Sequence, residues 1–126
     1  MSKQLEIGLV SLLSGVANVY PRLPQGVTLP AITYQREYTS RVSSIDGGNT
    51  GPTEAGIQVD CIADTMEDAK DTADAVRAIL HGYIGAWGTL TAHFVTLETE
   101  NDFFNQDGDD VNHWVTQRYA IWTNMD

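Results

Sequence analysis

Apolar and polar residues alternate along residues 56–63, and the period of the pattern changes along residues 65–80. The first stretch predicts a half-buried strand, because side chains two apart point to the same face of a strand. Its inward-facing residues are Ile57, Val59, Cys61 and Ala63. Asp64, with Glu67 three residues later, resembles a capping box and predicts that a helix begins at about Thr65. A strand that leads directly into a capped helix is therefore expected.

The predicted helix has two faces of opposite character. Its apolar residues recur three and four apart, which is typical of a helix that covers a core, and its carboxylates fall on another side. Gly82 and Gly85 then end the helix. The apolar stripe is Met66, Ala69, Ala73, Val76 and Leu80, and the acidic face is Asp64, Glu67, Asp71 and Asp74. We expect the acidic face to meet water or the lining of a channel.

The rest of the chain predicts one more helix and three more strands. Leucines spaced along residues 2–14 predict an amphipathic helix. Prolines in and beside residues 19–29 predict an irregular connector, because proline lacks a backbone donor and restricts the residue before it. Residues 43–52, rich in glycine, and residues 101–112, rich in aspartate, are predicted to be loops. The strands are expected at residues 31–42, 53–63, 89–100 and 111–123.

These elements follow the order helix, strand, strand, helix, strand, strand (αββαββ). Consecutive strands most simply pair as antiparallel hairpins. We therefore predict an α+β fold, with a four-stranded mainly antiparallel sheet and two helices packed on one face. With 126 residues, 42% of them hydrophobic, the chain is expected to form a single domain over residues 1–126.

The charge of the chain narrows the function classes. Seventeen acidic residues against seven basic ones give a net charge of -10, which argues against wrapping nucleic-acid phosphates with Lys and Arg. An acidic surface that keeps the protein in solution is one interpretation, and a negative channel lining past which DNA slides is the other. No apolar run approaches the roughly 20 residues of a membrane-spanning helix, and the amino-terminal residues lack a signal-peptide cleavage site. No membrane partner is expected.

The residues that can carry chemistry do not form a recognisable catalytic or metal site. Cys61 lies on a predicted strand between Asp60 and Asp64, a setting unlike the electropositive one of a reactive thiol. His93 and His113 face each other only if the last hairpin aligns them, which leaves a shared metal as an alternative. The acidic residues 102–110 fail the spacing of a calcium loop. We therefore predict no catalytic residues, no cofactor and no metal.

Two features predict interaction surfaces. The glycine-rich loop is longer than a tight turn needs, and we expect it to be mobile and to become ordered on docking. Trp114 and Trp122 share one face of the last strand, opposite Val115 and Tyr119, and are interpreted either as core or as a subunit interface. The candidate docking loop consists of Ser44, Ile45, Asp46, Gly47, Gly48, Asn49, Thr50 and Gly51.

Three sequence segments occur in a particular order. They are Val19-Tyr20-Pro21, LPAITYQR at residues 29–36, and IQVDCIADTMEDAKDTADAVRAIL at residues 57–80. With the amino-terminal helix before them and a hairpin after them, they resemble the tail completion or tail-terminator family of long-tailed bacteriophages. The resemblance covers most of the chain, and it lacks matching residues in the two predicted loops.

The resemblance implies a non-enzymatic virion assembly protein, made in the host cytoplasm. It implies a homo-oligomeric ring, usually a hexamer, at the head-proximal end of the tail tube, which stops tube polymerisation and joins the tail to the head. The implied partners are further copies of the chain, the tail tube protein and the head-tail connector or head completion protein. DNA is implied only as a polymer that passes through the ring.

Two other functions remain open from the sequence. One is another neck or minor tail protein of similar fold. The other is a small metal-binding or enzymatic α+β domain, which requires a cluster of polar residues that the sequence does not indicate.

Overall fold

The computed structural model describes residues 2–22, 28–41, 53–107 and 110–123. The predicted docking loop, residues 44–51, lies outside the described residues. The elements are α1 (Ser2–Leu13), β1 (Asn18–Tyr20), β2 (Ala31–Arg41), β3 (Thr53–Ala63), α2 (Met66–Leu80), β4 (Gly85–Trp87), β5 (Leu90–Asp107) and β6 (Asp110–Thr123).

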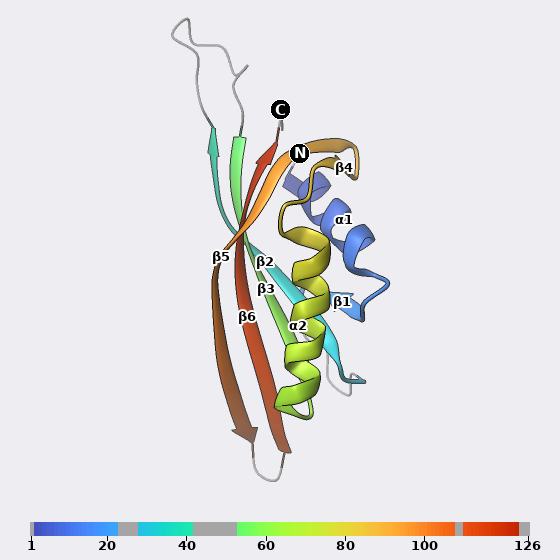
Figure 1. Ribbon diagram of the computed structural model, residues 1–126, viewed down its shortest axis with the longest axis vertical. Coiled ribbons are helices and arrows are strands. Elements are labelled where there is room, and N and C mark those ends of the chain that lie inside the picture. The colour runs from blue at the N-terminus through green and yellow to red at the C-terminus, as the bar shows by residue number, and fades with distance from the viewer. Residues whose placement is uncertain (1, 23–27, 42–52, 108–109, 124–126) are drawn as a thin grey trace, which may run out of the picture.

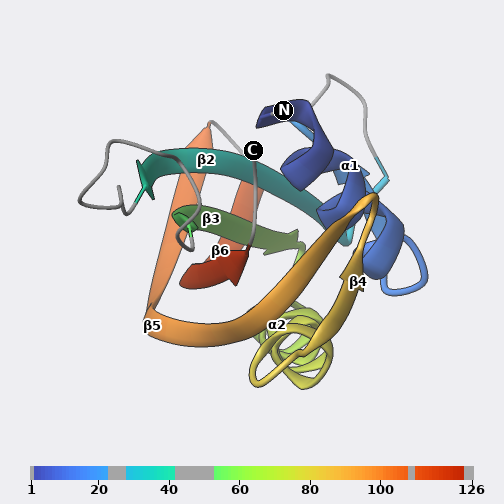
Figure 2. The same cartoon turned by 90° about the horizontal axis from the view of Figure 1, so that it is seen from above.

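The strands form a mixed six-stranded sheet with the order β1-β2-β3-β6-β5-β4. β1 pairs parallel with β2, and every other neighbouring pair is antiparallel. Both helices lie on the same side of this sheet (Figure 1). Viewed from above, the strands turn progressively and the sheet wraps into an open half-barrel (Figure 2), as expected from the right-handed twist of strands.

The predicted four-stranded, mainly antiparallel sheet is wrong, although the fold is α+β. The sheet gains one short strand at each edge, β1 and β4, and each has three residues. A three-residue strand is too short to display a period of two, and β1 lies in the segment whose prolines predicted a connector. The prolines do not interfere with β1, because it ends at Tyr20, just before Pro21.

The last hairpin is also longer than predicted. The acidic loop expected at residues 101–112 is mostly strand, since β5 runs to Asp107 and its register with β6 continues to Asp110. The side chains of Asn101 and Asp102 are exposed to solvent. Polar residues are tolerated in a strand when they face water. The polar composition of this segment suggested a loop, but the backbone hydrogen bonds between β5 and β6 continue through it.

The core lies between the sheet and the two helices. The indole of Trp87 is fully buried, and its Nε1 donates to the carbonyl oxygen of Leu5 at 2.7 Å. Gly8 of α1 makes this packing possible, because a Cβ there would lie 2.3 Å from Cδ1 of Trp87. Large buried residues of this core are Trp87, Tyr119, Leu5, Leu9, Leu13, Ile32, Ile57, Leu80 and Ile121.

The start of α2 differs by one residue from the prediction. Thr65, not Asp64, is the N-cap, and its hydroxyl oxygen accepts from the backbone N–H of Asp68 at 3.1 Å. At the other end His81 caps the helix, and the N–H of Gly82 donates to the carbonyl oxygen of Val95 on β5 at 2.7 Å. The helix is therefore tied to the sheet at its carboxyl end.

Candidate functional site: the helix-free face of the sheet

The side of the sheet away from the helices carries both tryptophans that the sequence analysis singled out. In β6, Val115 and Tyr119 belong to the core, so Trp114 and Trp122 point to the opposite side. We call this side the helix-free face. Its residues include Tyr38, Glu54, Gln58, Asp60, Phe94, Phe103, Trp114, Thr116, Arg118 and Trp122, as the strand registers indicate.

Each tryptophan on this face has a phenylalanine directly opposite it. Phe94 of β5 is the register partner of Trp122, and Phe103 is the partner of Trp114. The two phenylalanines are 43% and 53% exposed, whereas the tryptophans are half-buried. Cross-strand aromatic pairs of this kind stabilise the sheet and still present apolar surface.

Sequence reasoning missed the two phenylalanines. Strict alternation along β5 places Phe94 on the same side as Ala92, because residues two apart normally share a face. A register shift between Ala92 and Phe94 breaks that rule, and Ala92 is fully buried while Phe94 is exposed. A bulge of this kind has no signal in the hydrophobic pattern, since it inserts one residue into one strand only.

A polar group lies between the two aromatic pairs. The carboxylate of Asp60 accepts from the hydroxyl of Thr116 at 2.7 Å, from the amide of Gln58 at 3.2 Å and from the hydroxyl of Thr33 at 3.4 Å. These four residues come from three adjacent strands. The network satisfies a partly buried carboxylate and holds the strands in register.

Carboxylates gather further along the helix-free face. The phenol of Tyr38 donates to Glu54 at 2.6 Å, and Arg118 pairs with Glu37 at 3.3 Å. The hydrogen bond to Glu54, then burial, and then the charges of Glu54, Glu98 and Glu37 raise the pKa of Tyr38 to about 12. The tyrosine therefore stays protonated at neutral pH and acts as a donor.

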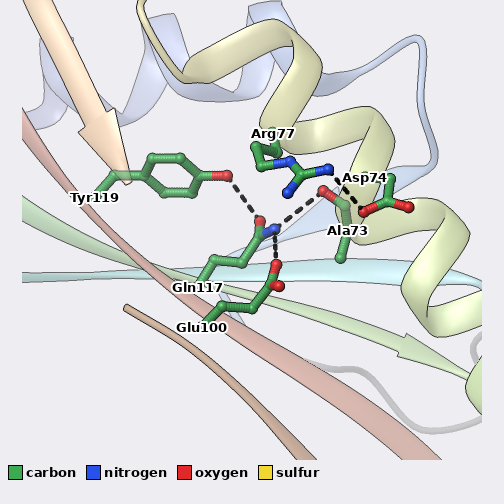
Figure 3. Close-up of polar contacts among 6 residues, drawn as sticks. All are labelled: Ala73, Asp74, Arg77, Glu100, Gln117 and Tyr119. Atoms are coloured by element: carbon green, nitrogen blue, oxygen red, sulfur yellow. Dashed lines mark hydrogen bonds and ion pairs between the residues drawn. The ribbon is translucent and has the colours of Figure 1, made fainter. Parts of the chain in front are cut away.

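A buried polar junction links the sheet to α2 on the other side (Figure 3). The amide of Gln117 is fully buried and donates to the carbonyl oxygen of Ala73 at 3.0 Å and to Glu100 at 2.7 Å. The phenol of Tyr119 donates to the side-chain oxygen of Gln117 at 2.8 Å. Burial, and then the neighbouring Cys61 and Glu100, raise the pKa of Tyr119. Every polar atom of the Gln117 amide thus has a partner inside the molecule.

The thiol and the histidines do not form a reaction centre. Burial and the charges of Asp60 and Glu100 raise the pKa of Cys61 to about 12, so the nucleophilic thiolate is absent at neutral pH. His113 lies opposite Phe104, far along the hairpin from His93, which rules out the shared metal considered from the sequence. Nδ1 of His81 accepts from the backbone N–H of Leu97. Within the part of the chain that the structure describes, no group of three potential metal ligands occurs.

The acidic face of α2 points to solvent as predicted. The predicted residues Asp64, Glu67, Asp71 and Asp74 are exposed, and so is Asp68. Asp74 pairs with Arg77 at 3.3 Å, and Lys70 pairs with Asp102 of β5 at 3.1 Å. A shallow groove of about 550 Å³ runs beside this face and is lined by Asp74, Arg77, Ala78, His81 and Leu97. The groove is open, and its ionic groups are already paired or exposed.

These features describe a small structural α+β domain, whose surfaces suit contacts with other proteins. The chain belongs to the family of the tail completion protein gp17, whose family model matches residues 8–124. It is therefore a structural protein of tail assembly and a component of the virion. This confirms the family resemblance noted from the sequence.

A solved structure has a similar fold. It is titled "Virion of native gene transfer agent (GTA) particle", and the matched chain superposes with a TM-score of 0.65 at 16% sequence identity. The match covers 97% of this chain and 90% of that one. No curated protein sequence matches the chain significantly. Among the described residues, no helix is long and apolar enough to cross a membrane.

Proposed function

We propose that this protein forms a ring at the head-proximal end of the phage tail tube, stops further polymerisation of the tube and joins the tail to the head connector. The observation that carries this proposal is the match of nearly the whole chain to the tail completion family. The ring is most simply a hexamer of identical copies.

The surfaces of the described residues support a protein with several partners. The helix-free face presents Phe94 and Phe103 to solvent, and α2 presents an acidic face on the opposite side. We infer that Trp114 and Trp122, with the phenylalanines paired to them, take part in a subunit contact. The tail tube protein and the connector or head completion protein are the other expected partners.

In this proposal, DNA passes through the ring and is not bound tightly by it. The net charge of -10 disfavours tight binding to phosphates. An acidic channel lining lets the polyanion slide past the ring without adhering to it.

A phage lacking this protein tests the proposal directly. We expect tails of uncontrolled length that do not join heads, as seen by electron microscopy, and restoration of normal particles by the protein supplied in trans. Tails of normal length attached to heads would contradict it. Tails of normal length that remain unattached would favour the alternative of another neck or minor tail protein.

The predicted docking loop has its own test. Deletion of residues 46–51 is expected to leave the protein folded and assembled but unable to engage one docking partner. Light scattering measures assembly, and co-sedimentation with tail tubes or with heads identifies the lost partner. Unfolding of the deletion variant, or full attachment to both partners, would contradict the docking role.

A further inference from the structure

A second apolar surface lies between α1 and β2, on the opposite side of the sheet from the helix-free face. An open cleft of about 260 Å³ there is lined by Glu6, Ile7, Val10 and Tyr34. The side chain of Ile7 is 51% exposed beside this cleft. An exposed isoleucine next to an open cleft is a surface that a partner can cover. We call the four lining residues the α1–β2 cleft.

The β2 wall of the cleft leads to a cation that has no charged partner. Tyr34 lies opposite Val59 and Arg36 lies opposite Ile57. Both register partners belong to the core, so Tyr34 and Arg36 project to the side of the sheet that carries the helices. Burial and then the charge of Glu6 raise the pKa of Tyr34. Arg36 makes no ion pair with a described residue, since the ion pairs there use other cations, and it is available to a carboxylate of another molecule.

The helix-free face has the opposite charge around Phe94. Glu54 is the register partner of Trp122, and Trp122 is the partner of Phe94, so a carboxylate lies in the same row as the two aromatic rings. Glu98 is exposed at the second register shift of β5. Besides the hydrogen bond to Glu54 and burial, the charge of Glu98 raises the pKa of Tyr38, which places Glu98 near the same group. Neither Glu54 nor Glu98 makes an ion pair with a described residue.

These charges restrict how two copies can meet. Two helix-free faces placed together would bring Glu54 and Glu98 of both copies into one contact, and like charges across an interface repel. The α1–β2 cleft offers an apolar seat and an unpaired cation instead. Because both helices lie on one side of the sheet and the helix-free face on the other (Figure 1), one copy can use both surfaces at once, as every member of a closed ring must.

The spacing along the two strands allows an aromatic contact and a charge pair to form together. Four residues separate Phe94 from Glu98, about 13 Å along β5, and two separate Tyr34 from Arg36, about 7 Å along β2. The long arginine side chain spans the difference. A stable interface buries about 800 Å² on each partner, so neighbouring residues of both surfaces contribute as well.

We propose that neighbouring copies pack face to back: Phe94 of one copy enters the α1–β2 cleft of the next, and Arg36 beside that cleft faces Glu98 of the first copy. The contact joins two different surfaces, so it repeats from copy to copy and closes when the rotation between copies allows. It uses side chains alone and leaves the pairing of β1 with β2 intact. The proposal rests on the self-assembly given under Proposed function, and it adds the surfaces that meet.

Cysteine crosslinking tests the contact, because the native Cys61 is buried and leaves a clean background. Arg36→Cys and Glu98→Cys place one thiol on each surface. In the full-length protein carrying both changes, assembled in solution or in particles, a short bis-maleimide is expected to produce a ladder of covalent multimers. The two single variants are expected to give a covalent dimer only when they are produced together.

The control for crosslinking is Asp71→Cys with Glu98→Cys. It moves one thiol to the exposed side of α2 and is expected to stay monomeric in denaturing gels. Covalent dimers from Glu98→Cys alone would show that two helix-free faces meet each other, and they would overturn the proposal.

Charge reversal supplies a second readout. Arg36→Glu and Glu98→Arg are each expected to weaken self-association by roughly tenfold, as judged by light scattering across a concentration series, because like charges then face each other. The double variant is expected to recover most of the loss, because the pair is restored with its charges exchanged. Arg77→Glu makes the same change in charge on the exposed side of α2 and is expected to leave association nearly unchanged. Losses that add up in the double variant would contradict the pairing.

The apolar part of the contact has its own matched pair of variants. Ile7→Ser is expected to weaken self-association by roughly tenfold, because it removes the exposed apolar wall of the cleft. Ile84→Ser changes an isoleucine that is 69% exposed and belongs to neither surface, and it is expected to leave association nearly unchanged. Circular dichroism checks that each variant is folded.

The outcomes separate this proposal from the function on which it rests. Assembled rings that give no ladder and tolerate both Arg36→Glu and Ile7→Ser would overturn the face-to-back contact and leave the ring intact as a function. A protein that stays monomeric at all concentrations, in a phage whose tails are normal without it, would overturn the proposed function itself. A crosslink from Glu98→Cys to the tail tube protein in place of a second copy would also overturn the contact proposed here.

Discussion

At the scale of single residues, Gln117 shows how a polar side chain at a core-facing position of a strand can stabilise the fold. The period of β6 placed it beside Val115, Tyr119 and Ile121, where an unpaired amide is costly. Its two N–H groups and its oxygen all find partners, on α2, on β5 and on its own strand. The amide therefore stabilises the packing of α2 on the sheet.

Replacing Gln117 with leucine is expected to lower the free energy of unfolding by about 1–3 kcal/mol, because the carbonyl of Ala73 and the phenol of Tyr119 each lose a partner in a buried place. Urea denaturation measures the change. Arg77→Gln is the matched control, since it removes only the exposed ion pair with Asp74 and is expected to cost less than about 0.5 kcal/mol. Equal losses in the two variants would contradict a structural role for the junction.

Cys61 is a second residue whose burial decides its chemistry. Its pKa is raised from 9.0 to about 12, so the thiol is expected to resist maleimide at about pH 8 when folded and to react in denaturant. Because the folded pKa is above the unfolded one, the contribution of the neutral thiol to stability is present below pH 9 and is lost as the pH rises towards 12.

Urea unfolding of the wild type and of Cys61→Ala between pH 9 and pH 10 isolates this effect. The pKa values of Tyr38 and Tyr119 are raised above 10.0, so these two side chains remain protonated in that window when the protein is folded. The wild type is expected to lose stability more steeply with pH than the variant. Parallel curves, or rapid labelling of the folded thiol, would contradict the burial argument.

At the scale of elements, the sequence located each long helix and strand but misjudged their ends. Continuous periodicity identifies an element, whereas its last residues depend on single hydrogen bonds. The shift of the α2 cap from Asp64 to Thr65 is one case, because either side chain is a good cap by composition. The extension of β5 to Asp107 is another, because pairing with β6 outweighs its polar residues.

The cap can be assigned by mutation. Thr65→Ala is expected to lower the free energy of unfolding by about 1 kcal/mol, since the N–H of Asp68 loses its acceptor. Asp64→Ala at the neighbouring exposed residue is expected to change it by no more than about 0.5 kcal/mol. Thermal or urea unfolding of the two variants decides between them, and a larger loss for Asp64→Ala would reinstate the capping box expected from the sequence.

At the scale of the whole molecule, the two sides of the sheet have different roles. One side is covered by α1 and α2 and holds the core, whereas the helix-free face exposes Phe94 and Phe103. Exposed cross-strand aromatic residues contribute at most about 1 kcal/mol to the stability of one copy but contribute strongly to a contact that buries them. This division explains how a small domain can be stable alone and still present an apolar surface to a partner.

Phe103→Ser is expected to leave the free energy of unfolding within about 1 kcal/mol of wild type. Because the helix-free face is proposed to form a contact in the particle, the same change is expected to lower the yield of complete particles in a complementation assay by roughly tenfold. Ile84→Ser is the matched control, since Ile84 is 69% exposed but lies outside the helix-free face. Equal yields from both variants would show that Phe103 makes no contact in the particle.

The sequence by itself determined the two helices, the four long strands, the side of β6 that carries Trp114 and Trp122, and the family. These follow from periods and motifs that are local to the chain. Only the tertiary structure decided the outer strands β1 and β4 and the β5 bulge that exposes Phe94. Those features depend on which backbone groups form hydrogen bonds across the sheet. The bonded residues lie far apart along the chain, so no local pattern in the sequence predicts their pairing.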